Sequence, residues 1–331
     1  MLIIGIESSC DDTSVALVEC SDKGHFVIAE KTASQIDIHA KYGGVVPEIA
    51  GRMHAEKIVP LIEEVLKNQK IPDAIAVTSG PGLITGLLVG AEAARTLSYA
   101  KNIPLVAVNH LEGHIHSVEL EKPIMEFPAL ALIVSGGHTE IVLMHDHGDY
   151  EILGKTKDDA AGECFDKVAK ILGLPYPGGP QISKLAETGN TKAIEFPRPM
   201  LNQENFDFSF AGLKTSALYW LRDNKMDKKI TINDFCASVE QAIIDVLVAK
   251  TLLAANVHKP KTVILAGGVA ANKKLRETFK KTFSTTNLLT PSIQYCMDNA
   301  AMIAVAGYYK AKKGQYTDCR ELEVDPNWNL D

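Results

Sequence analysis

The sequence predicts an α/β protein built from two lobes of like plan with a cleft between them. Residues 2–19 contain an apolar strand, a polar turn of small residues and a second apolar strand, and residues 129–144 repeat that plan. Each hairpin is followed by segments that alternate between helical and strand-like patterns. At 331 residues the chain is also long enough for roughly two domains.

The first repeat continues with two helices and two strands. Residues 48–69 have helical periodicity, and Pro60 should bend that helix because proline removes a backbone hydrogen bond. Strands are predicted at 71–80 and 103–110, and the segment 83–100 between them reads as a helix. The apolar residues of that second helix fall on one stripe: Ile84, Leu87, Leu88, Ala91 and Leu97.

The second repeat has the same ingredients after its hairpin. Helices are predicted at about 158–172 and 232–256, and a strand at 261–268 is followed directly by another helix. Residues 176–226 look like loop and short helix.

Composition narrows the setting. The net charge of −7 argues against an unaided general nucleic-acid binder, although a local basic groove stays open. The six cysteines include no CxxC pair and indicate reduced thiols. The first residues turn polar too early for a signal peptide, and no apolar run reaches spanning length. We therefore expect a cytoplasmic protein with no membrane partner.

Three loops that follow strands are rich in small residues: SSCDDTS, SGGHT and GGVAAN. Backbone N–H groups in such loops can hold a phosphate, although each loop alone could simply be a tight turn. Their occurrence at analogous points of two repeats favours a nucleotide-type ligand.

Residues 109–117, NHLEGHIHS, raise the question of a metal site. Asn109 is a plausible N-cap, and His110 and His114 then lie about 40° apart on one helical face, where both can reach one ion. Glu112 lies about 160–200° away from them, and His116 is also turned aside. The zinc-protease string HExxH needs its glutamate beside the metal, so the protease interpretation fails on geometry. From spacing alone the pair remains either a metal site or a polar helix face.

A series of longer strings carries a family resemblance. In chain order they are ESSCDDTS, GGVVPEIAGRMH, SGPGLITGLLVG, NHLEGHIHS, IVSGGHT, AAGECFDKVAK, YPGGP, FSFAGLKT, AGGVAAN and MDNAAMIA. Together they closely resemble the tRNA threonylcarbamoyladenosine transferases (TsaD family), in their bacterial or organellar form. The resemblance covers nearly the whole chain.

The resemblance implies the two-lobed actin/Hsp70/sugar-kinase-like fold with duplicated RNase H-like lobes and a central cleft. We expect an N-terminal lobe over 1–108 and a C-terminal lobe over 109–331 that carries the metal and adenylate sites, with the helix after about residue 298 packing back on the N-terminal lobe. The implied reaction moves a threonylcarbamoyl group from threonylcarbamoyl-AMP to N6 of adenosine 37, in tRNAs that read codons beginning with A, and releases AMP. Implied partners are tRNA, a paralogous lobe-like subunit (TsaB type) and a small ATPase (TsaE type).

The resemblance also implies site residues. Asp298 would join His110 and His114 as the third metal ligand, although an aspartate before an apolar helix is usually an N-cap. Two histidines and one carboxylate suit Fe(II), which the family favours, or Zn(II). The implied substrate contacts are Val134, Ser135, Gly136, Gly137, His138, Asp166, Gly179 and Asn272. Two of these have simpler interpretations, because Asp166 could pair with Lys170 and Asn272 could cap the following helix.

No residue is assigned as a covalent nucleophile, because the acyl-adenylate is already activated and alignment can supply much of the rate. An ATP-driven actin- or Hsp70-like scaffold is an alternative. The loop ESSCDDTS opposes it, since its three carboxylates replace the glycine turn that holds a triphosphate in such proteins.

Overall fold

The protein, represented by a computed structural model, is described over residues 1–120, 125–224, 226 and 229–330. It divides into two compact units. Unit 1 comprises Met1–Met125, Asp146–Tyr150 and Leu289–Asp331, and unit 2 comprises Glu126–His145 and Glu151–Leu288. Unit 1 thus extends beyond residue 108, where we expected the N-terminal lobe to end, and it also takes in the last segment of the chain.

Unit 1 is built on a five-stranded sheet of order β3-β2-β1-β4-β5. The strands β1 and β2 form the expected antiparallel hairpin, and β1–β4 and β4–β5 are parallel. Their bounds are β1 Leu2–Glu7, β2 Asp12–Ser21, β3 Gly24–Ser34, β4 Ala74–Gly80 and β5 Leu105–Asn109.

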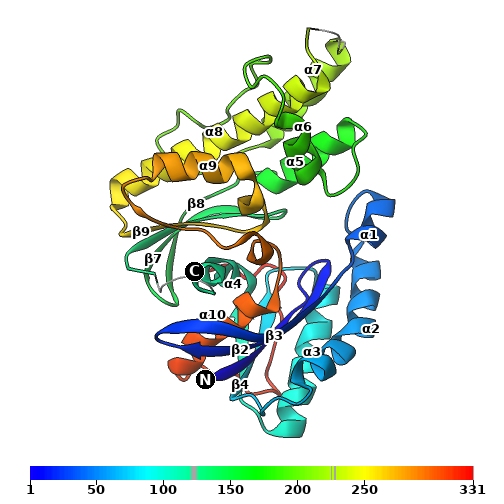
Figure 1. Ribbon diagram of the computed structural model, residues 1–331, viewed down its shortest axis with the longest axis vertical. Coiled ribbons are helices and arrows are strands. Elements are labelled where there is room, and N and C mark those ends of the chain that lie inside the picture. The colour runs from blue at the N-terminus through cyan, green and yellow to red at the C-terminus, as the bar shows by residue number, and fades with distance from the viewer. Residues whose placement is uncertain (121–124, 225, 227–228, 331) are drawn as a thin grey trace. The chain divides into compact units, whose positions relative to one another are not determined.

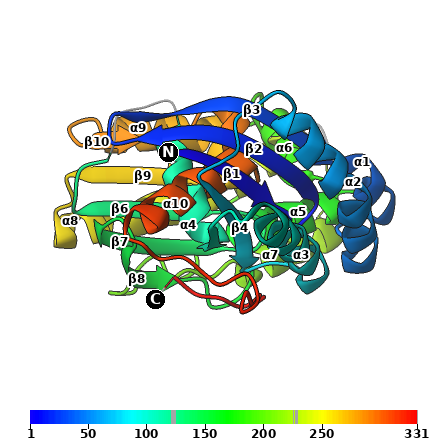
Figure 2. The ribbon, with the colours of Figure 1, turned by 90° about the horizontal axis from the view of Figure 1, so that it is seen from below.

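Helices cover both faces of this sheet. On one face Ile4 and Leu17 pack with Ile58 and Ala91, which belong to α2 (Pro47–Leu66) and α3 (Ile84–Lys101). The alternate strand residues face α10 (Ala300–Lys312), which lies beside β2 in Figure 1 and beside β1 in Figure 2. Pro60 lies inside α2 without ending it. The remaining helical segments of unit 1 are α1 Ile36–His39, η1 Ala40–Tyr42, α4 His110–His116, η2 Ser117–Glu119 and η4 Ile293–Tyr295.

The sheet that runs through unit 2 repeats the plan of the first. Its order is β10-β9-β6-β7-β8, in which β6 pairs antiparallel with β7 and parallel with β9, as β1 does with β2 and β4. The bounds are β6 Ala129–Val134, β7 Thr139–Asp146, β8 Asp149–Lys155, β9 Thr262–Ala266 and β10 Asn287–Leu289. The predicted internal repeat is therefore confirmed in the strand order.

The helices of unit 2 follow the sequence prediction except in one region. The long helix α8 (Ile232–His258) and α5 (Ala161–Ile171) begin close to the expected positions. Residues 176–226, expected as loop and short helix, contain α6 (Gly178–Ala186) and the thirteen-residue α7 (Ala211–Asp223). The segment after β9 forms η3 (Gly268–Ala271) and α9 (Lys273–Thr282). Within the described residues, none of the helices has both the length and the apolar character needed to span a bilayer.

Candidate functional site

The short helix α4 presents the two spaced histidines. Asn109 ends β5 and caps α4, because its Oδ1 accepts a hydrogen bond from the Leu111 N–H at 2.9 Å. Its Nδ2 donates to the carbonyls of Trp328 and Asn329 at 3.1 and 3.2 Å. One asparagine therefore fixes the start of α4 and fastens residues 328–329 to it.

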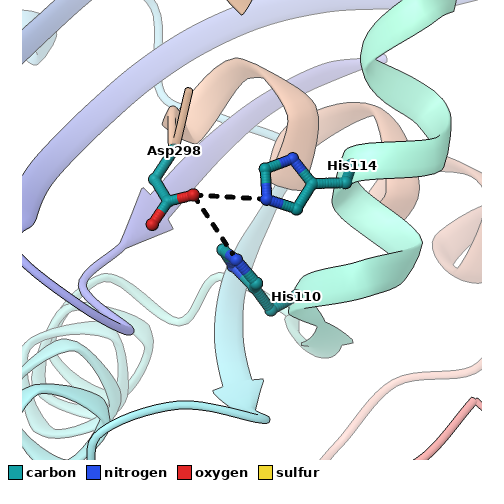
Figure 3. A group of neighbouring side chains, drawn as sticks. All are labelled: His110, His114 and Asp298. Carbon is teal, nitrogen blue, oxygen red and sulfur yellow. Dashed lines mark ion pairs between the residues drawn. The ribbon is translucent and has the colours of Figure 1, made fainter. Parts of the chain in front are cut away.

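His110, His114 and Asp298 converge, as Figure 3 shows. Asp298 Oδ1 lies 3.5 Å from Nε2 of His110 and 3.2 Å from Nε2 of His114. The two imidazole rings are 4.6 Å apart at an angle of 78°, so they approach the carboxylate from different directions. One ligand atom from each residue lies within 4.8 Å of the others, a spacing that a single ion can bridge.

The donor set fits a divalent transition metal. Both ring nitrogens of His114 are buried and have no hydrogen-bond partner, so the contact with Asp298 is close without having hydrogen-bond geometry. An unsatisfied buried polar group costs about 1–3 kcal/mol, which a bound cation would offset. Two imidazole nitrogens and one carboxylate oxygen are the ligands of open Fe(II) or Zn(II) sites.

A buried carboxylate, Glu7, lies on the other side of His110. Its Oε2 is 3.0 Å from the Nδ1 of His110. Burial raises the pKa of Glu7, but the adjacent His110 lowers it more, and the net direction is downward. Burial lowers the pKa of His110, whereas Glu7 and Asp298 together raise it to about 9. The two groups therefore stabilise each other's charged forms.

Asp298 does not cap the last helix. The N-cap of α10 is Asn299, whose Oδ1 accepts from the Met302 N–H at 2.9 Å. The interpretation of Asp298 as an N-cap is wrong, and its carboxylate faces the histidines.

Glu112 and His116 face away from this cluster, as their helical angles predict. Glu112 accepts from the Tyr150 hydroxyl at 2.9 Å and pairs with Lys310 at 3.1 Å. His116 Nδ1 lies 2.9 Å from Glu119 Oε2. A glutamate bound to a lysine and a tyrosine cannot serve as the base of an HExxH site, so the protease geometry is absent from α4.

His116, Glu119 and His147 form a second group whose side-chain spacing would suit a metal. Here two of the three residues already have hydrogen-bond partners, because His116 contacts Glu119 through Nδ1 and the Tyr150 hydroxyl through Nε2 at 3.3 Å. Glu119 Oε1 also accepts from the Met125 N–H at 3.1 Å. His116 and Glu119 are therefore hydrogen-bonded within the protein, unlike His114.

The acidic first loop adds negative charge near Asp298. Burial raises the pKa of Asp12 to about 7, and the neighbouring Asp298 and Asp11 add to that effect. Asp11 is shifted in the same direction by burial and by Asp298. A site with this charge attracts a cation and opposes a triphosphate.

The loop residues expected to hold the adenylate belong to unit 2. The SGGHT turn joins β6 to β7, and the Ser135 N–H bonds the His138 carbonyl at 2.9 Å. A side-chain carbon at Gly136 or Gly137 would meet no atom within 4 Å, so the tip of the turn is open. At Gly162, by contrast, such a carbon would lie 2.4 Å from the Ser135 carbonyl oxygen, because the start of α5 packs directly on the turn.

Three further predicted residues lie on neighbouring elements of unit 2. Asp166 Oδ1 accepts from the N–H groups of Gly178 and Gly179 at 2.7 and 3.3 Å, so it caps α6. Asn272 caps α9 through the Leu275 N–H at 2.8 Å, which confirms that simpler role. Its Nδ2 also donates to Ser183 and Glu240, both at 2.7 Å.

The two loops of unit 2 meet at Val134. A side-chain carbon at Gly267, which has φ of +90°, would lie 2.5 Å from the Val134 carbonyl oxygen. The structure thus joins Val134 to the GGVAAN loop and Asp166 to Gly179, all within unit 2. Sequence reasoning missed Glu7 as a partner of His110 and missed Glu240 as a partner of Asn272. The signal for Glu7 was a carboxylate directly after a buried apolar strand.

The fold defines the class of protein. The activator of the 2-hydroxyisocaproyl-CoA dehydratase from Clostridium difficile with bound ADPNP aligns over 95% of this chain and 97% of that one, with a TM-score of 0.54 and 14% identity. The HypF protein of T. kodakarensis aligns over 98% of this chain and 49% of its own, with a TM-score of 0.63 and 14% identity. The chain therefore has the actin/Hsp70/sugar-kinase-like fold, as expected.

Sequence similarity gives the family. Residues 26–305 match the family model TsaD, tRNA N6-adenosine threonylcarbamoyltransferase. The protein of that name from Bacillus subtilis is 50% identical over 322 residues, which cover 95% of this chain and 92% of the relative. That from Carboxydothermus hydrogenoformans is 49% identical over 320 residues, covering 95% and 94%. The chain belongs to the TsaD family of tRNA N6-adenosine threonylcarbamoyltransferases, which are acyltransferases.

Proposed function

We propose that this protein transfers the threonylcarbamoyl group of threonylcarbamoyl-AMP to N6 of adenosine 37, in tRNAs that read codons beginning with A, and releases AMP. The observation that carries the proposal is the convergence of His110, His114 and Asp298 in a chain that belongs to the TsaD family along almost its whole length. The protease alternative is opposed by the orientation of Glu112, and the ATP-driven scaffold by the acidic first loop.

His110, His114 and Asp298 would hold one divalent metal, Fe(II) by family resemblance or Zn(II) by the same ligand chemistry. When bound, such a metal supplies Lewis-acid polarisation and orientation of the threonylcarbamoyl group. The protein itself contributes a preorganised ligand set, because α4 carries both histidines and Asp298 directly precedes the N-cap of α10.

The adenylate part of the substrate would lie on unit 2. The open turn Val134–His138 offers backbone N–H groups, and Gly136 and Gly137 leave room for a phosphate to approach them. Asp166, Gly179 and Asn272 would line the remainder, held by the contacts that fix α6 and α9. The oxygen–carbon bond to AMP breaks as the N6–carbon bond forms; AMP leaves with the bonding electron pair, and N6 gives up one of its two protons to solvent.

The tRNA would be shared with other subunits. The net charge of −7 leaves weak general attraction for phosphate, so a paralogous lobe-like subunit (TsaB type) and a small ATPase (TsaE type) would complete the binding surface. We place their docking on unit 1, where α2 and α3 expose apolar side chains such as Val59, Ile84 and Leu88.

The proposal is tested by supplying synthetic threonylcarbamoyl-AMP, unmodified tRNA and candidate partner subunits to the purified protein, and measuring threonylcarbamoyladenosine by nucleoside mass spectrometry. We expect one modified adenosine per tRNA and an equal amount of AMP. Steady ATP turnover without tRNA, together with no modified nucleoside, would support the scaffold alternative instead.

A further inference from the structure

Glu7 is a fully buried carboxylate at the end of β1, and all its described partners are hydrogen-bond donors. Its Oε1 accepts from the Ser9 N–H at 2.6 Å, and its Oε2 accepts from the Thr78 hydroxyl, also at 2.6 Å. The third partner is the Nδ1 of His110, 3.0 Å from Oε2. Two donors outside the metal cluster therefore hold the carboxylate in place against one side of the His110 ring.

The two ring nitrogens of His110 face different surroundings. Nδ1 faces Glu7 and the Ser9 hydroxyl, which lies 3.1 Å away, whereas Nε2 faces Asp298 Oδ1 at 3.5 Å. A neutral imidazole carries a hydrogen on one nitrogen and a lone pair on the other. Because a carboxylate can only accept, the hydrogen belongs on Nδ1 and the lone pair on Nε2, pointing toward the cluster.

We infer that Glu7 is a positioning residue for the metal site: it holds His110 in the tautomer that offers Nε2 to the ion. This inference rests on the metal site of the proposed function, and it adds a residue that touches neither metal nor substrate. Such outer carboxylates orient a ligating histidine and strengthen its donation to the metal.

Glu7→Gln is a sharp test because the amide nitrogen must face a donor in either orientation. At the Oε1 position it opposes the Ser9 N–H, and at the Oε2 position it faces the Nδ1 of His110 and favours the wrong tautomer. We expect the dissociation constant for Co²⁺, titrated into the metal-free protein and followed by visible absorption, to rise about 10- to 100-fold with a changed band shape.

The segment η2, directly after α4, supplies a matched control. Glu119 is an equally buried carboxylate that contacts Nδ1 of His116 at 2.9 Å, outside the metal cluster. Glu119→Gln removes the same kind of pair, so it should lower thermal stability and leave the Co²⁺ titration within about twofold of the parent. Equal weakening of Co²⁺ binding by both variants would show a general effect of buried pairs on α4 and would overturn the inference.

A second measurement needs no change at Glu7. In the Zn²⁺-bound parent protein, ¹⁵N spectra of the imidazole groups should show His110 with its hydrogen on Nδ1 and its Nε2 bound to metal. The signals of His110 are identified by their absence from the spectrum of His110→Gln. Metal on Nδ1 would overturn the inference, as would parent-like Co²⁺ binding by folded Glu7→Gln. Failure of the parent to bind Co²⁺, or normal binding by His114→Ala, would instead remove the metal site on which the proposed function depends.

Discussion

At the scale of single residues, His114 is the proposed metal ligand with the fewest competing contacts. Neither ring nitrogen has a hydrogen-bond partner, so removing the ring breaks no hydrogen bond that supports the fold. We expect His114→Ala to lose bound metal and to lower transfer by at least about 100-fold, beyond the usual effect of an outer residue. Metal analysis and the transfer assay should fall together while circular dichroism stays unchanged.

The control for His114→Ala is His145→Ala. The side chain of His145 is about half exposed (51%) and lies outside the cluster of His110, His114 and Asp298. This variant should keep full metal content. Normal transfer by metal-free His114→Ala would show that the transfer reaction does not need the metal.

A substitution at Gly137 should affect ligand binding without affecting folding. A side-chain carbon there meets no protein atom within 4 Å, so Gly137→Val should fold normally and yet place a side chain where a phosphate must approach the backbone. We expect binding of a stable threonylcarbamoyl-AMP analogue to be abolished in calorimetry, with little change in melting temperature. Gly162→Val, which would collide with the Ser135 carbonyl, should instead lower stability. Unchanged binding by Gly137→Val would mean that the adenylate lies elsewhere.

At this same scale, sequence spacing placed His110 and His114 on one face and turned Glu112 away, and the structure confirms both. The angle between residues of one helix is fixed by the backbone, so it can be calculated from sequence alone. Asp298 and Glu7 could not be calculated in this way, because their contacts with the histidines join segments about 103 to 190 residues apart. A tertiary contact over that distance leaves no local pattern.

At the scale of elements, α4 depends on its cap. Asn109→Ala removes the acceptor for the Leu111 N–H and both donors to residues 328–329, and should cost about 1–2 kcal/mol in the free energy of unfolding. Asn109→Asp keeps the acceptor but turns a carboxylate toward two carbonyl oxygens. We expect Asn109→Asp to retain α4 while hydrogen exchange accelerates near Trp328. Equal exchange in the two variants and the parent would show that Asn109 does not fasten that segment.

The packing of β3 against α10 makes a pH-dependent contribution to the free energy of unfolding. Burial lowers the pKa of His25 to about 4, an effect that Glu119 partly opposes, and the ring contacts Tyr308 and Tyr309 of α10. The unfolded chain takes up this proton below about pH 6.5 and the folded protein only near pH 4, so stability falls as pH drops through that window.

The pKa of His25 differs by about 2.5 between the unfolded and the folded protein. Its protonation therefore lowers the free energy of unfolding by at most about 3 kcal/mol by pH 4. In His25→Gln, which cannot take up this proton, denaturant unfolding should depend less on pH between 4 and 6.5. Parallel stability curves for parent and variant would show that His25 is not the source of the dependence.

The two longer strands missed by sequence reasoning share one property. β3 lies at the edge of its sheet and exposes much of its length, and β8 occupies the equivalent edge of the other sheet. Edge strands carry polar residues on their open side, so the apolar run that marks a central strand is absent. The repeat of central strands could be predicted because burial on both faces demands apolar residues in sequence.

At the scale of the whole molecule, electrostatics predict weak tRNA binding by the chain alone. Lys157 pairs with Asp207, and Lys167 and Lys214 both pair with Asp159, so these ammonium groups are already neutralised. The exposed basic residues of α9 are Lys273, Lys280 and Lys281, and we expect these to make the main phosphate contacts. Three phosphate contacts correspond to a salt slope of only about 2–3 in log–log form.

We expect fluorescence titration at about 0.15 M salt to show weak binding with this shallow slope, and both affinity and slope to rise when the partner subunits are added. Lys280→Glu with Lys281→Glu should weaken binding further, whereas Lys157→Glu should change it little. Tight binding by the isolated chain would contradict this division of labour.

The discontinuous make-up of unit 1 has a consequence for biosynthesis. Asp298 and the segment that bonds Asn109, Ser79 and Gly82 come after unit 2 in the chain, although they complete a structure begun at residue 1. A ribosome adding about 5–20 residues per second must make all of unit 2 before the third proposed metal ligand exists. The emerging chain therefore carries the two histidines without Asp298 for roughly ten seconds or more. The three-residue cluster can form only after translation has passed residue 298.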